Sequence, residues 1–213
     1  MATAVDRDGG AEQEAASAAF IAKAIGSILG ICGAVGLLAA FTLAVEKLRI
    51  VEDPTYIPTC SINPILSCGS VMTTDQAEAF GFPNPLLGIA GFAAVTAIGV
   101  ALLGGAKLPR WLWLAVQAGL TFALVFVHWL FFQSLYRIEA LCPYCMVVWV
   151  VTIVAFLYCT LHNLAQGNLS VPPRLRGAVS VAVRYHGVLL TLWFAVLVLL
   201  IGEAFWSFWR TLP

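Results

Sequence analysis

Long apolar runs, separated by shorter polar segments, account for most of the chain. A helix needs about 20 apolar residues to cross the hydrocarbon core of a bilayer, and each run has roughly that length. The runs are residues 24–45, 85–106, 111–136, 140–161 and 185–202. The first run has 22 residues and is longer than a signal-peptide core of about 7–15 residues. The pattern therefore predicts five transmembrane helices and an all-α membrane protein.

The composition agrees with a membrane location. Hydrophobic residues make up 61% of the chain and charged residues 10%, whereas soluble domains contain about 25% charged residues. The net charge is zero and there is no basic tract, so nucleic-acid binding is not expected. Charged residues are scarce inside the apolar runs, which disfavours a transporter because transporters carry ionisable groups along their pathway.

Polar segments precede and connect the apolar runs. Residues 1–19 are small, polar and mildly acidic, which predicts a disordered cytoplasmic tail. Residues 46–83 are too many for an ordinary connection, and their aromatic and apolar content predicts a folded cap with a short helix at 75–79. Residues 164–184 form a cytoplasmic connection, and residues 185–213 form the fifth helix and an outer C-terminus.

Lysine and arginine residues predict the orientation of the helices. If the N-terminus is cytoplasmic, seven of these residues fall in cytoplasmic segments and four in outer segments, as the positive-inside rule favours. This orientation places the 46–83 cap and the start of the fourth run on the outer face, where disulfides persist. We therefore expect a multi-pass protein of the inner or plasma membrane with its active site on the outer side.

Four of the six cysteines form two pairs. Cys142 and Cys145 lie at the start of the fourth run, where free backbone N–H groups and the helix dipole stabilise a thiolate. Cys60 and Cys68 lie in the cap. Exchange between the pairs could pass two electrons from a thiol outside the membrane to an acceptor inside it. Cys145 is one turn, about 4.5 Å, deeper than Cys142, within reach of a lipid-soluble acceptor such as a quinone.

Other interpretations of the cysteines remain open. The two pairs could be structural disulfides that fasten the cap, although a Cys-x-x-Cys bridge on a helix has poor geometry. Zinc sites usually pair two closely spaced cysteine motifs, whereas seven residues separate Cys60 from Cys68, so no metal is expected. Cys32 and Cys159 lie within apolar runs and are interpreted as packing residues.

The order and spacing of these residues resemble the vitamin K epoxide reductase family in its bacterial form. The resemblance covers about residues 24–161. It rests on Cys60-x7-Cys68, Thr74 six residues later, Asn84-x3-Gly88 at the start of one span, and Cys142-Pro143-Tyr144-Cys145 at the start of another. The other bacterial quinone-linked thiol oxidase, the DsbB type, has its Cys-x-x-Cys before the wider pair, so the order here disfavours it.

The resemblance implies a four-helix catalytic bundle over residues 20–163, covered by the cap. At its centre the resemblance implies a quinone of the menaquinone, ubiquinone or vitamin K type. Cys60 is then the cysteine that meets the partner protein, and Cys68 passes electrons to Cys142. Cys145 reacts with the quinone.

Three further residues are assigned from the same resemblance. Thr74 resembles a family hydroxyl that bonds within the cap, with a helix cap as the alternative. Asn84 resembles a family asparagine whose amide donates to a quinone carbonyl, with a turn residue as the alternative. Trp149 is assigned to the quinone site at a position where the vertebrate enzymes have tyrosine. Because tryptophan lacks a hydroxyl, this position argues against an epoxide substrate and against a vertebrate-type inhibitor response.

These observations predict a membrane thiol oxidase that supports disulfide formation in exported proteins. Many bacterial relatives carry a fused thioredoxin-like domain after the fifth span, whereas this sequence ends at Pro213, which indicates either a separate partner or a truncated sequence. A separate extracytoplasmic thioredoxin-like protein of the DsbA type is therefore expected as the electron donor. Two alternatives remain: a quinone-epoxide reductase that uses the same relay, and a non-enzymatic membrane protein with structural disulfides.

Overall fold

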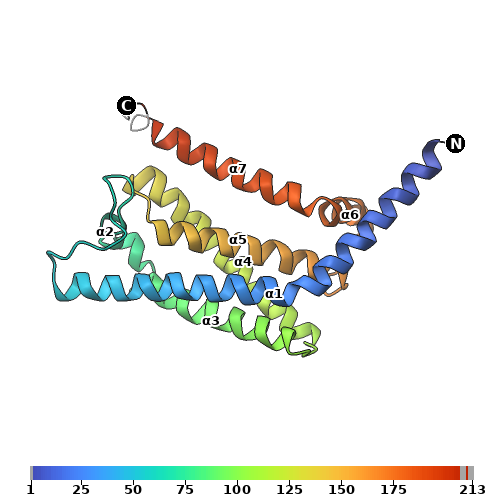
Figure 1. Ribbon diagram of the computed structural model, residues 1–213, viewed down its shortest axis with the longest axis horizontal. Coiled ribbons are helices and arrows are strands. Elements are labelled where there is room, and N and C mark those ends of the chain that lie inside the picture. Colours follow the sequence, from blue (N-terminus) through green and yellow to red (C-terminus); the bar gives the residue numbers. More distant parts are fainter. Residues whose placement is uncertain (1, 207–209, 211–213) are drawn as a thin grey trace.

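The computed structural model describes residues 2–206 and residue 210, and its long helices run side by side (Figure 1). The long helices are α1 (Ala2–Glu52), α3 (Asn84–Leu103), α4 (Arg110–Gln133), α5 (Pro143–Ala165) and α7 (His186–Ala204). The short ones are α2 (Cys68–Met72), η1 (Asp75–Glu78), η2 (Ser134–Ile138), η3 (Pro173–Leu175) and α6 (Arg176–Arg184). Within the described residues, five helices are long and apolar enough to cross a membrane and no strand occurs. The predicted all-α membrane fold is confirmed.

The first helix differs from the prediction at both ends. α1 includes residues 2–19, where the sequence predicts a disordered tail. Alanine and glutamate favour helix in this segment, and a segment that extends an existing helix avoids the cost of starting a new one. α1 also continues from the predicted end at residue 45 to Glu52, which shortens the cap to residues 53–83.

Glycines allow α1 and α3 to pack closely. A Cβ atom on Gly99 would collide with the backbone of Gly30, and one on Gly33 would lie 2.6 Å from the backbone nitrogen of Thr96. Small residues permit such an approach between membrane helices, whose association depends on close packing because lipid removes the hydrophobic driving force. These two helices form one wall of the bundle.

The central helix of the bundle is α5. It packs against α1 on one side and α4 on the other, and its fully buried residues include Ile153, Ala155 and Cys159. α3 rests on α1 and α4 rests on α5, but α3 and α4 make hardly any contact with each other. The bundle is therefore tight around α5 and open between α3 and α4.

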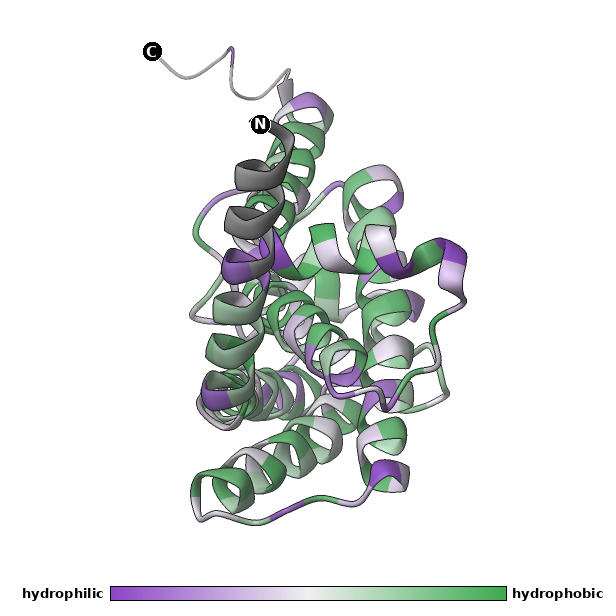
Figure 2. Ribbon diagram, turned by 90° about the vertical axis from the view of Figure 1, so that its right-hand side faces the viewer, coloured by the Kyte–Doolittle hydropathy of each residue, from purple (hydrophilic) through white to green (hydrophobic). Residues whose placement is uncertain are grey.

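The C-terminal part runs along the outside of the bundle (Figure 1). The predicted connection at 164–184 contains α6, which packs near the start of α1, where Arg184 Nε donates a hydrogen bond to Gln13 Oε1 at 2.8 Å. Trp193 Nε1 on α7 donates to His128 Nε2 on α4 at 3.1 Å. Apolar residues dominate the long helices (Figure 2), as a location in lipid requires.

The cap, residues 53–83, folds over one end of the bundle (Figure 1). It contains α2 and η1, and η1 corresponds to the short helix expected at 75–79. Lys47 at the end of α1 fastens it: the Nζ atom donates to the Met72 carbonyl at 2.8 Å and pairs with the Glu78 carboxylate at 2.9 Å. The cap is thus held over the ends of the helices.

Candidate redox site

Backbone hydrogen bonds hold the cap against the start of α5. Leu141 N–H donates to the Ile65 carbonyl at 2.7 Å, and Ser67 N–H donates to the Leu141 carbonyl at 2.9 Å. The two segments run parallel here, as neighbouring strands do. Cys68 directly follows Ser67, and Cys142 directly follows Leu141. This pairing therefore brings the two cysteines together.

Cys60, Cys68 and Cys142 place three sulfur atoms in succession. A disulfide joins Cys60 to Cys68, and the Sγ atoms of Cys68 and Cys142 are 3.2 Å apart. Cys68 and Cys142 are fully buried, whereas 6% of Cys60 is exposed. Thiol–disulfide exchange proceeds when a thiolate attacks a disulfide sulfur. The contact therefore suits exchange of the disulfide from the Cys60–Cys68 pair to a Cys68–Cys142 pair.

Cys142 lies just before the first residue of α5, as its N-cap. Its Sγ accepts a hydrogen bond from the backbone N–H of Cys145 at 3.4 Å. The pKa of Cys142 lies below that of an ordinary thiol, first because the Cys145 thiol donates a hydrogen bond to its sulfur. The backbone N–H groups of Cys145 and Tyr144 add to this effect, and burial opposes it. The thiolate form, which is the reactive nucleophile, is therefore favoured at Cys142.

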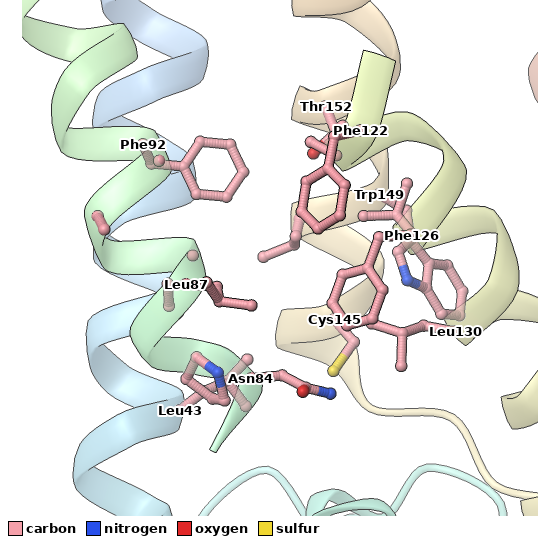
Figure 3. A pocket seen from close by; sticks show the side chains of 18 of the residues that line it. Leu43, Asn84, Leu87, Phe92, Phe122, Phe126, Leu130, Cys145, Trp149 and Thr152 are labelled. Carbon is pink, nitrogen blue, oxygen red and sulfur yellow. The ribbon is translucent and has the colours of Figure 1, made fainter. Parts of the chain in front are cut away.

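Cys145 lines a cavity of about 570 Å³ (Figure 3). The cavity lies between α3 and α4, with α5 along one side, and its lining is mostly apolar. Its volume falls within the range of about 300–1,000 Å³ that is usual for organic ligands. The Cys145 sulfur and the Asn84 amide lie at the same end of the cavity, next to the cap, and Phe122 and Phe126 line it from α4. The second sulfur of the Cys142–Cys145 pair therefore faces a ligand-sized apolar space.

The cavity opens between α3 and α4, because these helices hardly touch. Gly91 on α3 and Gly119 on α4 line the opening, and a Cβ atom on either glycine would meet nothing within 4 Å. The side chains that could close the gap are therefore absent at both positions. A hydrophobic ligand dissolved in the bilayer has a path to Cys145 between these helices.

A comparison with protein families assigns this arrangement. Residues 27–160 match the sequence model of the Vitamin K epoxide reductase family, and this segment contains both cysteine pairs, the cap and the cavity. This chain belongs to the vitamin K epoxide reductase family. The resemblance seen in the sequence is confirmed. A comparison with curated proteins finds no match.

Membership of the vitamin K epoxide reductase family makes this protein a membrane thiol–disulfide oxidoreductase. The matched segment ends within α5, so α6 and α7 lie outside it. The two cysteine pairs and the cavity therefore all belong to α1, the cap, α3, α4, η2 and α5.

In this family member, Asn84 is the first residue of α3 and lies at the cap end of the cavity (Figure 3). Its Nδ2 donates to the Gln76 carbonyl at 2.7 Å, and its Oδ1 accepts from the Ala79 N–H at 3.1 Å. These bonds join the cap to α3, as the turn-residue interpretation expects. An amide nitrogen carries two hydrogens, so one remains for a ligand, and the role toward a quinone stays a prediction.

Thr74 and Trp149 lie in different parts of the site. The Thr74 hydroxyl donates to the Val71 carbonyl at 2.8 Å, within the cap and outside the cavity lining, and makes no capping bond to η1. Trp149 lines the cavity one turn after Cys145, and its ring meets Phe131 edge-on with centroids 5.1 Å apart. Thr74 therefore supports the cap, and Trp149 shapes the cavity wall.

Two buried polar residues near the site are missing from the sequence-based assignments. Glu46 is 4% exposed, and its Oε1 accepts a hydrogen bond from the Thr59 hydroxyl at 2.9 Å. Thr59 directly precedes Cys60 in the chain. The sequence places Glu46 in the cap because the first apolar run ends at residue 45. Thr152 lines the cavity and follows Cys145 by seven residues, a helical spacing that would have indicated a shared face.

Proposed function

We propose that this protein is a membrane thiol oxidase. It takes two electrons from a reduced, separate thioredoxin-like protein and passes them through its two cysteine pairs to a quinone. The 3.2 Å contact between Cys68 and Cys142 carries the proposal. It links a disulfide in the cap to a thiol pair whose second member, Cys145, lines the cavity.

The first exchange takes place at the cap. A thiolate of the partner attacks Cys60, the more exposed sulfur of the pair, and the Cys60–Cys68 bond breaks. The partner's second thiol then displaces Cys60 from the mixed disulfide. The partner leaves with a disulfide, and Cys60 and Cys68 become thiols, so two electrons have entered the protein.

The second exchange moves those electrons inward. Cys68 attacks Cys142 of an oxidised Cys142–Cys145 pair and releases Cys145 as a thiol. Cys60 then attacks Cys68 and releases Cys142, which restores the Cys60–Cys68 disulfide and leaves the inner pair reduced, the state of the structure. Potential differences set the direction of these reversible steps.

The cavity residues fit a quinone. The mostly apolar lining suits an aromatic ring and a lipid tail, and the amide of Asn84 offers a donor beside Cys145. A bound quinone supplies a two-electron, two-proton acceptor for the Cys142 and Cys145 thiols. The aromatic side chains of Trp149, Phe122 and Phe126 exclude water from the place where the protons leave.

The proposed orientation follows from the lysine and arginine distribution, which places the cap on the outer face of an inner or plasma membrane. Thioredoxin-like oxidants of exported proteins and persistent disulfides are found on that side. The product would be an oxidised partner that forms disulfides in exported proteins.

Quinone reduction by the purified protein tests this function. The assay mixes the protein with a reduced thioredoxin-like dithiol protein and follows quinone loss by ultraviolet absorbance. Wild type should turn over, Cys145→Ser and Cys142→Ser should not, and Cys32→Ser, which changes a buried cysteine on α1, should behave as wild type. Quinone-dependent dithiol oxidation by Cys145→Ser would refute the relay. If folded wild type does not turn over, small dithiols tried as donors would show whether only the choice of partner was wrong.

A further inference from the structure

The Thr152 hydroxyl differs from the other threonine hydroxyls that the structure describes in the long helices. Threonines in helices usually donate to the carbonyl four residues earlier, and five do so here at 2.7–2.9 Å. They are Thr42, Thr96, Thr121, Thr160 and Thr191. Thr152 is 1% exposed, yet within the described part of the chain its Oγ1 atom has no hydrogen-bond partner. A buried hydroxyl without a partner destabilises the protein, so a hydrogen-bond partner from outside the chain would stabilise it.

The position of Thr152 points to the cavity as the source of that partner. Thr152 lines the cavity, at the end opposite to Asn84 and Cys145 (Figure 3). It follows Trp149 by three residues and Cys145 by seven, so the three side chains share one face of α5. The other uncharged polar side chains of the lining, such as Gln76 and Asn84, belong to the cap end. Thr152 is therefore the polar group at the far end of the cavity.

We infer that the Thr152 hydroxyl donates a hydrogen bond to the quinone carbonyl that is farther from Cys145. This inference rests on the proposed function, because it names a contact for the ligand of that same cavity. Asn84 then faces the near carbonyl, and the two polar groups hold the ring between them. Trp149, which lies between Cys145 and Thr152 on α5, packs against the ring.

Distances along α5 agree with this placement. Seven residues correspond to a rise of about 10.5 Å along the helix axis between the Cα atoms of Cys145 and Thr152. A hydrogen bond from Thr152 takes about 2.8 Å, and contact between the Cys145 sulfur and a ring carbon takes about 3.7 Å. About 4 Å remains, which matches the distance across a six-membered ring from a carbon beside one carbonyl to the oxygen of the other. The length of a quinone ring therefore agrees with the spacing of these two residues on α5.

The inference separates a ligand contact from a structural one. A hydroxyl that supports the fold makes hydrogen bonds to the protein, and its removal lowers stability. The Thr152 hydroxyl makes none, so Thr152→Val, which keeps the shape and removes the hydroxyl, should leave the melting temperature of the ligand-free protein unchanged or higher. The same variant should bind the quinone more weakly, because only the complex loses a hydrogen bond.

The test measures the dissociation constant of 2-methyl-1,4-naphthoquinone, by quenching of protein fluorescence, together with the melting temperature without ligand. Thr152→Val should raise the dissociation constant about two- to tenfold, the usual range for one neutral hydrogen bond. Thr152→Ser, which keeps the hydroxyl, should stay close to wild type. Thr121→Val is the matched control, because the Thr121 hydroxyl bonds its own helix at 2.7 Å and lies outside the cavity lining.

The possible results distinguish a failure of the Thr152 contact from a failure of the proposed thiol oxidase function. If wild type binds and reduces the quinone and Thr152→Val has an unchanged dissociation constant, the Thr152 contact is overturned. The proposed thiol oxidase function then still stands. A lower melting temperature in Thr152→Val without ligand would assign a structural role to the hydroxyl and also overturn it. Absence of quinone binding by folded wild type would refute the proposed quinone site, and the Thr152 contact with it.

Discussion

Gly119 allows the cavity to be changed without disturbing the packing of the helices. It lies inside α4 and lines the cavity, and a Cβ atom there would meet nothing within 4 Å. Replacing glycine by alanine or leucine inside a helix gains about 0.8–1 kcal/mol when no clash arises. For a chain of this size, that gain raises the melting temperature by about 2–4 °C. Gly119→Leu should therefore be as stable as wild type or more so.

The expected effect on activity is the opposite. A leucine side chain at Gly119 occupies the gap between α3 and α4 through which the tail of a quinone would pass. Loss of about 1.4 kcal/mol of binding corresponds to a tenfold weaker affinity, and a blocked path should cost at least that. Turnover at low concentrations of a quinone with an isoprenoid tail should fall at least tenfold.

Two control variants make this prediction refutable. Gly202→Leu, on α7, also enters open space but lies away from the cavity, so it should keep full turnover. Gly99→Ala collides with the backbone of Gly30 and should lower stability by about 1–3 kcal/mol, the usual cost of overpacking. Wild-type turnover by Gly119→Leu would contradict the proposed path, and a melting temperature as low as that of Gly99→Ala would contradict the open space at Gly119.

Two further predictions concern the cap and the thiol pair. Lys47→Ala removes the bonds to Met72 and Glu78. It should lower the free energy of unfolding by about 1–2 kcal/mol and speed protease cleavage of the cap. Lys107→Ala, outside the site, should change neither quantity. The lowered pKa of Cys142 stabilises the folded, reduced protein above the ordinary thiol pKa, and this contribution is lost as the pH falls through the lowered value. Ultraviolet thiolate absorbance should therefore titrate below the ordinary thiol range, and Cys145→Ala, which removes the thiol donor, should shift the titration upward; an unshifted titration would argue against the Cys145 hydrogen bond.

The fold was largely predictable because the bilayer restricts it. Backbone groups in lipid must be bonded internally, so an apolar run of sufficient length becomes a helix whatever its detailed sequence. The difference between the predicted tail and the helix at residues 2–19 has a separate origin. Low hydrophobicity indicates that a segment cannot fold alone, but these residues extend a helix that the apolar run already starts, and α1 begins at Ala2.

The candidate site was predictable in its residues and less so in its geometry. Spacing alone identified Cys142 and Cys145, because a helix start gives thiols a recognisable setting. The contact of Cys68 with Cys142 joins residues 74 positions apart, and it depends on the pairing of Leu66 with Leu141, for which apolar patterns carry no signal. The unpartnered hydroxyl of Thr152 is equally hidden in the sequence, since most helical threonines bond their own backbone.

The cap links the two halves of the site, and this affects how variants are interpreted. Its residues 65–67 pair with Leu141 and set the Cys68–Cys142 contact, while the carbonyl of Gln76 and the N–H of Ala79 bond the Asn84 amide at the cap end of the cavity. A change at Asn84 therefore loosens the cap and alters the cavity together, so lost activity in an Asn84 variant would not distinguish relay from quinone binding. The Thr152 hydroxyl makes no hydrogen bond to the described part of the chain, and for this reason it reports on the ligand alone.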